Sequence, residues 1–104
     1  MIKVSILYPN EAGSNFDHAY YRDSHMPMVK ERLGDACLRF AIDKGLGGPA
    51  PGSPAPYHAI GELYFNSVAD FGAAMAPHGK EINADIKNYT SVKPVMQVSE
   101  VVIG

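Results

Sequence analysis

The chain has 104 residues and a formal net charge of -2, and 46% of its residues are hydrophobic against 19% that are charged. This composition excludes a disordered or disulfide-dense chain, and so weak a charge gives no reason to expect nucleic acid or an anionic membrane as a partner. One domain covering residues 1–104 is expected at this length.

The first seven residues carry no sign of a secretion signal, because no basic segment precedes an apolar core. No stretch approaches the roughly 18 apolar residues that a membrane-spanning helix requires. The single cysteine, Cys37, cannot form an internal disulfide, which fits a reducing compartment. We therefore expect a cytoplasmic protein with no membrane partner.

The N-terminal part of the chain predicts a strand followed by a helix. Apolar residues alternate over 2–8, so residues 2, 4, 6 and 8 share one strand face. Asp17 is a predicted helix N-cap. The helix is expected to end at His25, because Pro27 lacks an N–H group and disfavours a helical conformation at Met26.

The rest of the chain predicts three strands and further helical segments. These are a helical segment over 27–34, strands over 37–44, 58–65 and 94–103, a helix capped by Ser67 and closed by Pro77, and a helical turn or two over 81–87. Residues 45–57 include four glycines and four prolines, so we expect a surface loop. It would be a mobile lid or an ordered arm across a partner subunit.

The element order is strand-helix-strand-strand-helix-strand, which is the ferredoxin-like βαββαβ arrangement of the α+β class. A four-stranded antiparallel sheet would carry both main helices on one face. Depending on register, the uncovered face would present apolar residues such as Val4, Ile6, Phe40 or Val98. An exposed apolar face of that size is unfavourable in a monomer, so we expect a homodimer.

His25 is the candidate acid/base residue. The predicted break at Pro27 places it at a helix C-terminus, where free carbonyl groups favour imidazolium. A histidine so placed could act as acid or base near neutral pH, and Tyr21, four residues earlier, could reach the same space. The alternative is that His25 only caps the helix and Tyr21 is a packing residue.

Three polar residues within the predicted strands are candidate ligand-binding residues, namely Tyr8, Tyr64 and Gln97. A polar side chain that points into a cleft between sheet and helices needs a partner, and a polar ligand could supply it. The sequence leaves the face of each residue open, because a shift of one residue in register moves it to the other side of the sheet.

The sequence predicts neither a metal site nor a cofactor. His18 and His25 lie seven residues apart, but no third ligand has metal-site spacing. The run Gly45-Leu46-Gly47-Gly48 lacks the Gly-Lys-Ser/Thr ending of a phosphate-binding loop and precedes a strand. No G-x-G-x-x-G motif opens a helix.

Several runs of the sequence together resemble the EthD family, which is named for ethyl tert-butyl ether degradation. They are Tyr8-Pro9 at the end of the first strand, Phe16-Asp17, the run Tyr20-Tyr21-x-x-x-His25-Met26-Pro27, and residues 48–57, 67–71, 86–90 and 94–95. The resemblance covers nearly the whole chain. It implies a dimeric α/β-barrel fold with a cleft between sheet and helices, and it aligns His25 with the family's histidine.

The family is similar to small proteins that include cofactor-free isomerases, cyclases, dehydratases and monooxygenases, and its members are often labelled oxidoreductases. We therefore hypothesise an enzyme of a catabolic or tailoring pathway that acts without cofactor on a small, largely apolar organic molecule. His25 would be its acid/base, and Tyr21 or another tyrosine of the cleft would orient that residue. The alternatives are a non-catalytic protein that binds such a molecule for a monooxygenase system, and an inert structural dimer.

Overall fold

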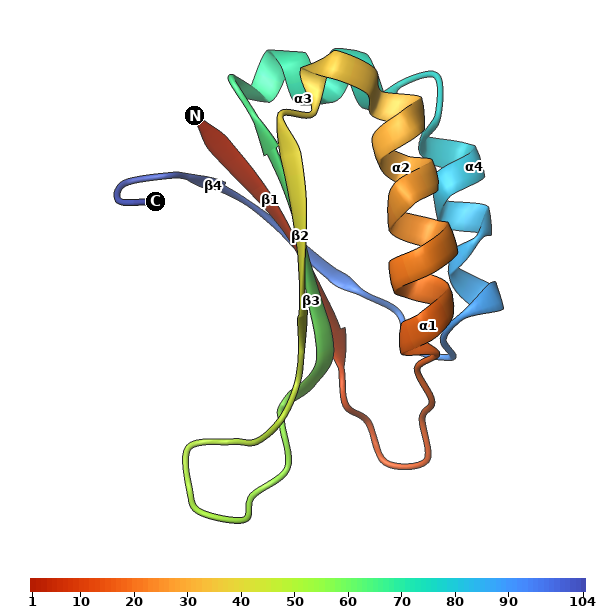
Figure 1. The fold of residues 1–104 in the computed structure, drawn as a ribbon, viewed down its shortest axis with the longest axis vertical. Coiled ribbons are helices and arrows are strands. Elements are labelled where there is room, and N and C mark those ends of the chain that lie inside the picture. The colour runs from red at the N-terminus through yellow and green to blue at the C-terminus, as the bar shows by residue number, and fades with distance from the viewer.

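The computed structural model describes all 104 residues, and its framework is a four-stranded antiparallel sheet with helices on one face (Figure 1). The strands lie in the order β2-β3-β1-β4. Their bounds are Ile2–Pro9 for β1, Arg39–Lys44 for β2, Tyr57–Phe65 for β3 and Val95–Glu100 for β4. The predicted ferredoxin-like arrangement is thereby confirmed. The last strand is shorter than predicted, because its partner β1 begins at Ile2, opposite Glu100.

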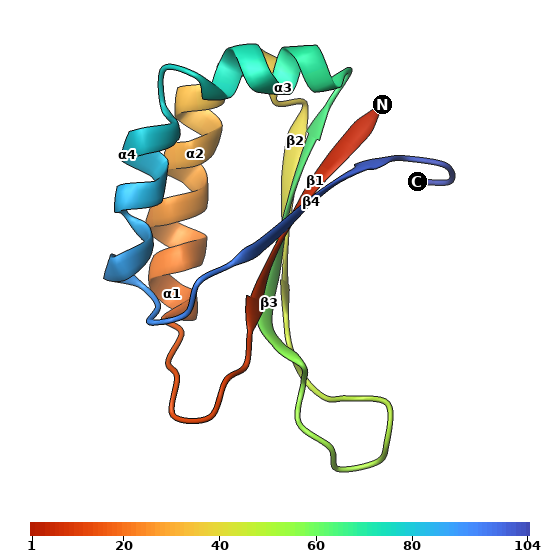
Figure 2. The same cartoon turned by 180° about the vertical axis from the view of Figure 1, so that it is seen from behind.

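The helices form a second layer, in which α2 and α4 lie side by side and α3 crosses one end (Figures 1 and 2). Their bounds are His18–Tyr20 for α1, Met26–Leu33 for α2, Val68–Met75 for α3 and Gly79–Ala84 for α4, with a π-helical turn at Tyr21–His25 and 3-10 turns at Gly34–Ala36 and Ile86–Asn88. Both predicted caps are confirmed, since Asp17 and Ser67 each accept a hydrogen bond from a backbone N–H three residues on. None of the helices has the length and apolar character needed to cross a membrane.

The helix does not break at His25, contrary to the expectation from Pro27. Met26 keeps helical backbone angles, with φ -66° and ψ -38°, and the chain runs without interruption from α1 into α2. The π-helical turn accommodates the proline: the Met26 N–H bonds to the carbonyl of Tyr21, and Pro27 falls in the first turn of α2. His25 therefore lies inside a continuous helical path and not at the C-terminus of its own helix.

The strand register decides which apolar residues meet the helices. Val4 on β1 lies opposite Leu63 on β3 and Val98 on β4, and Phe40 on β2 also pairs with Leu63. Directly paired residues point to the same side of a sheet. Because Val4 is fully buried under the helices, all four residues belong to the helix-facing side, as does Ile6. The expectation that Val4, Ile6, Phe40 or Val98 would line the uncovered face was wrong.

The uncovered face of the sheet carries mostly polar side chains in their place. The Lys3 ammonium lies 3.0 Å from a carboxylate oxygen of Glu62. The guanidinium of Arg39 stacks 3.7 Å above the ring of Tyr64. The larger apolar residues of this face form one row of paired residues that crosses three strands, namely Val95, Leu7 and Ile60.

The glycine- and proline-rich loop of residues 45–57 projects beyond the end of the sheet and curves away from the helical layer (Figure 1). Its base is held by the Gly45 N–H, which donates to the His58 carbonyl over 2.9 Å. Most of its residues are exposed, as expected for a surface loop.

Gly34 is predicted to be essential to the end of α2. Its φ of 64° is a conformation that residues with a side chain rarely adopt, and a Cβ added at this position would meet open space. Gly34→Ala should therefore lower the free energy of unfolding by about 1–3 kcal/mol through backbone strain alone, as measured by urea denaturation. Gly72→Ala is the control: this exposed glycine lies within α3, where alanine should stabilise the helix by about 0.5–1 kcal/mol. Equal effects of the two substitutions would contradict the prediction.

Candidate functional site

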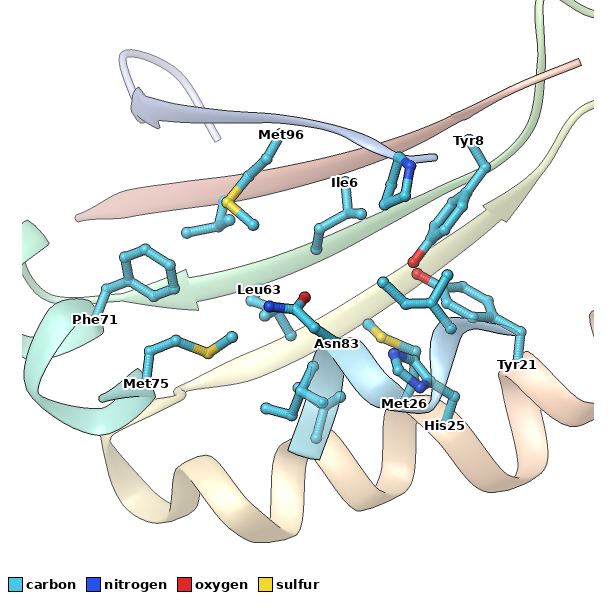
Figure 3. Close-up of a pocket in the computed structure, with 15 residues that line it drawn as sticks. Ile6, Tyr8, Tyr21, His25, Met26, Leu63, Phe71, Met75, Asn83 and Met96 are labelled. Carbon is cyan, nitrogen blue, oxygen red and sulfur yellow. The ribbon is translucent and has the colours of Figure 1, made fainter. Parts of the chain in front are cut away.

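A narrow apolar cleft lies between the sheet and the helices, and 12 of its 15 lining residues are hydrophobic (Figure 3). Its volume of about 50 Å³ has room for only a few water molecules. Figure 3 shows two chemically different ends. Phe71, Met75 and Met96 occupy one end, and the rings of Tyr8, Tyr21 and His25 gather at the other.

The π-helical turn and β1 together position the aromatic end of the cleft. Tyr21 and His25 begin and end the turn, and their rings stack with centroids 5.6 Å apart. Tyr21 is 0% exposed and His25 3% exposed. Tyr8 reaches the same space from β1, and its ring meets the Tyr21 ring edge to face at 5.2 Å. The structure thus brings three of the five predicted site residues together.

A chain of hydrogen bonds runs from the cleft through His25 to a carboxylate. The hydroxyl oxygens of Tyr8 and Tyr89 lie 2.7 Å apart, and the Tyr89 hydroxyl lies 3.3 Å from Nε2 of His25. Nδ1 of His25 lies 2.9 Å from a carboxylate oxygen of Asp85. An ionised carboxylate can only accept, so His25 donates its Nδ1–H to Asp85. Nε2 of the neutral ring then accepts a hydrogen bond from the Tyr89 hydroxyl.

Asp85 is held as a carboxylate by three donors. Besides His25, the Tyr20 hydroxyl donates to it over 2.7 Å, and the side-chain amide of Asn88 donates over 2.8 Å. Burial alone would raise the pKa of Asp85, but these hydrogen bonds outweigh burial and lower that pKa. The negative charge that orients the imidazole therefore persists at neutral pH.

Burial is also the main influence on the pKa values of His25, Tyr8 and Tyr89 in this hydrogen-bond chain, and on that of the neighbouring Tyr21. It lowers the pKa of His25, against the opposing effect of the Asp85 hydrogen bond and charge. Burial thus prevails over the influences that favour imidazolium, because the His25 side chain has almost no contact with water. Burial raises the pKa of Tyr8, Tyr21 and Tyr89, so all three hydroxyls stay protonated. The site combines a neutral base with hydrogen-bond donors.

The Tyr21 hydroxyl is buried and has no hydrogen-bond partner. Gly61 on β3 makes room for it, because a methyl group at that position would overlap the hydroxyl oxygen. Leaving a buried hydroxyl unpaired costs about 1–3 kcal/mol. Such groups are rare in folded proteins and mark places where a ligand or water completes the bonding.

Tyr64 and Gln97 do not reach this cleft. Tyr64 pairs with Lys3 and Gln97 with Ser5, which places both residues on the uncovered face of the sheet. There the Tyr64 hydroxyl donates to Glu62 over 3.2 Å, and the Gln97 amide donates to Ser99 over 3.0 Å. The strand register separates them from Tyr8, which lies on the other side.

Sequence reasoning missed Asp85 and Tyr89, which complete the hydrogen-bond chain. They lie 60 and 64 residues from His25 along the chain, so no local pattern joins them to it. The available signal was their four-residue spacing and the place of Tyr89 within residues 86–90, one of the segments that carry the family resemblance. No group of three or more histidine, cysteine, aspartate and glutamate side chains is arranged to hold a metal ion.

Comparisons with known proteins agree with this architecture. The family model described as the EthD domain matches residues 12–93. The chain belongs to the EthD family. It is 33% identical over 92 residues to an uncharacterized 11.0 kDa protein of the thcB-thcC intergenic region of Rhodococcus erythropolis, covering 88% of this chain and 85% of that protein.

Solved structures share the fold of this EthD-family chain. An EthD-like protein from Ralstonia eutropha JMP134 is 52% identical, with a TM-score of 0.94, 98% of this chain covered and 92% of that chain. A dimeric ferredoxin-like protein from an uncultured marine organism is 14% identical, with a TM-score of 0.55, 100% of this chain covered and 97% of that chain. The second likeness is one of fold alone.

The protonation of His25 should make stability depend on pH. Because its pKa is lower in the folded protein than its ordinary value of 6.5, the unfolded chain binds more protons in acid. The free energy of unfolding should therefore fall as the pH drops below about 6.5. His25→Gln should flatten this fall, as measured by urea denaturation between about pH 7.5 and 5.

His18→Gln is the matched control for this measurement. Burial also lowers the pKa of His18, but that side chain is less enclosed and should contribute less to the slope. A pH dependence that is the same in wild type and His25→Gln would show that His25 is not held neutral by the fold.

Proposed function

We propose that this EthD-family protein is an enzyme that, without a cofactor, transfers protons on a small, largely apolar organic molecule bound in the cleft. The observation that carries the proposal is the chain Tyr8–Tyr89–His25–Asp85 at the aromatic end of the cleft. A neutral imidazole oriented by a carboxylate is the arrangement that general acid–base catalysis requires.

The hydrogen-bond chain gives a route for the proton. Tyr8 lines the cleft, so its hydroxyl oxygen meets the ligand. As it accepts a ligand proton, its own proton passes to Tyr89, and the Tyr89 proton passes to Nε2 of His25. The imidazolium that forms is stabilised by Asp85 at 2.9 Å. Returning the proton to another ligand atom by the same path completes an isomerisation or elimination.

The lining of the cleft fits an apolar molecule. Met26, Met75 and Met96 all contribute to it, and unbranched methionine side chains repack at low cost. Their movement would enlarge the narrow cleft around a ring-sized ligand. Pro94 and Ile86 add further apolar surface, whereas no lysine or arginine side chain lines the cleft. An uncharged ligand is therefore favoured over an ionic one.

A non-catalytic binding protein for a monooxygenase system is the second candidate function. The hydrogen bond from Tyr89 favours it, because that bond occupies Nε2 of His25 in the resting state. In this function the hydrogen-bond chain would only hold the aromatic side chains that line the cleft in place. Turnover measurements on His25 variants separate the two candidates.

His25→Gln should reduce turnover by about 10²- to 10⁴-fold, because it removes the final proton acceptor. The assay follows C–H proton exchange or chemical conversion by NMR across a panel of small aromatic ketones, lactones and phenols. His78→Gln is the control, since His78 lies in the turn before α4, outside the cleft. Full activity in His25→Gln with unchanged ligand binding would reject the enzyme and favour the binding protein.

We further propose that the protein is a cytoplasmic homodimer. The apolar row of Val95, Leu7 and Ile60 crosses the uncovered sheet face, and such a row is best covered by a second copy. The fold is shared with a protein described as dimeric, which supports the same assembly. A reducing compartment fits Cys37, a buried free thiol.

Sedimentation equilibrium should therefore give twice the chain mass of 11.2 kDa at micromolar concentration. Leu7→Asp, which places a charge in the middle of the row, should shift the equilibrium to monomer. Ser5→Asp on the same strand face is the control for added charge beside the row. A wild-type protein that sediments as a monomer would contradict the dimer.

A further inference from the structure

We infer that the ligand of this cleft carries a carbonyl oxygen that accepts a hydrogen bond from the Tyr21 hydroxyl, and that the reaction removes a proton from the carbon beside that carbonyl. This inference rests on the proposed function and names its substrate class. It follows from the one buried hydroxyl that the protein leaves without a partner.

The Tyr21 hydroxyl is held in place beside the Tyr8 hydroxyl and is left without a hydrogen-bond partner. Its ring is packed against the rings of Tyr8, Phe16 and Tyr89, with centroids 5.1 to 5.2 Å away. This packing prevents the side chain from turning toward water. The hydroxyls of Tyr8 and Tyr89 bond to each other, whereas the Tyr21 hydroxyl bonds to neither and has its proton free for a ligand. A carbonyl oxygen of a ligand could accept a hydrogen bond from it.

The surroundings select the type of acceptor. The cleft is lined almost entirely by hydrophobic residues, and no cationic side chain lines it to compensate a carboxylate or phosphate. A carbonyl oxygen is uncharged when it binds and becomes negative only as the reaction proceeds. A buried neutral donor is worth most against such a developing charge. This arrangement distinguishes a carbonyl compound from an anion or a plain hydrocarbon.

The neighbouring hydrogen-bond chain supplies the other half of the reaction. The C–H bond beside the carbonyl breaks, and its electron pair forms a carbon–carbon double bond while the carbonyl π electrons move onto oxygen. The proton passes to Tyr8 as the Tyr8 proton moves to Tyr89 and the Tyr89 proton moves to His25. The product is an enolate that Tyr21 holds by its oxygen. Reprotonation restores the site, so neither oxidant nor reductant is consumed.

The shape of the cleft is consistent with a ligand that has one polar end. Tyr8, Tyr21 and His25 lie together at one end, while Met75 and Met96 lie at the other (Figure 3). A ligand oriented by its carbonyl at Tyr21 would extend its apolar body toward the methionines. Its acidic C–H group would then lie near the Tyr8 hydroxyl.

The test compares two probes of nearly the same shape, acetophenone and α-methylstyrene, in which a C=CH₂ group replaces the C=O group. Wild type should bind acetophenone more tightly by about 2- to 10-fold, the value of one buried hydrogen bond. It should also exchange the acetophenone methyl protons for deuterium in D₂O, followed by NMR. Tyr21→Phe should remove both the preference and most of the exchange, with α-methylstyrene binding unchanged.

Two further variants keep the test independent of folding. Tyr64→Phe removes a hydroxyl on the far side of the sheet and should retain the acetophenone preference. Tyr21→Phe should unfold at a temperature no lower than wild type, because it deletes an unpaired buried hydroxyl. If Tyr21→Phe is nevertheless unstable, Gly61→Ala replaces it, since the added methyl displaces the same hydroxyl.

Equal binding of the two probes by wild type would overturn the inference, as would a preference that persists in Tyr21→Phe. Failure of both probes to bind would also overturn it. The proposed function is decided separately by the effect of His25→Gln on the compound panel. A loss of turnover there, with no role for Tyr21, would leave an acid–base enzyme whose substrate is not held by a carbonyl group.

Discussion

The part-buried hydrogen bond between His25 and Asp85 joins the two halves of the helical layer, and the chemistry of the cleft depends on it. His25 comes from the π-helical turn before α2, and Asp85 follows the last residue of α4. This bond fixes the proton on Nδ1 and leaves Nε2 facing Tyr89. Without the Asp85 carboxylate, Nδ1 would have no hydrogen-bond partner to fix the position of the ring proton. The order of donors from Tyr8 to His25 would then be lost.

Pro27 acts on this site through the helix rather than by ending it. A proline within a helix leaves a carbonyl group without its donor, and here a π-helical turn absorbs the irregularity. The turn brings Tyr21 and His25 into a stack with only 15° between their ring planes. A regular helix would separate these residues by a different rotation. Four-residue spacing already puts both side chains on one helix face, and the π-helical turn sets the angle between their rings.

The predictable part of the structure is the part that depends on near neighbours in the chain. Alternating apolar residues located the strands, and the caps at Asp17 and Ser67 located two helix starts. Tyr8, Tyr21 and His25 could be chosen as site residues because strand position and helical spacing favoured them. The EthD resemblance reinforced the choice of His25.

The rest depends on contacts between distant segments. Strand register decides whether Tyr64 and Gln97 face the helices or the other side, and no local property of β3 or β4 fixes that register. The partnership of His25 with Asp85 spans 60 residues. The path of the chain through Pro27 was mispredicted because a proline favours a helix end in most contexts, whereas packing under the sheet stabilises a continuous helix here.

The protonation state of the His25 ring is the most direct test of this account. Nitrogen-15 NMR of the labelled imidazole at neutral pH distinguishes the two neutral tautomers from imidazolium. We expect a neutral ring with its proton on Nδ1 and an unprotonated Nε2. A ring protonated on Nε2, or a doubly protonated ring at neutral pH, would contradict the proposed hydrogen-bond chain and the base that it creates.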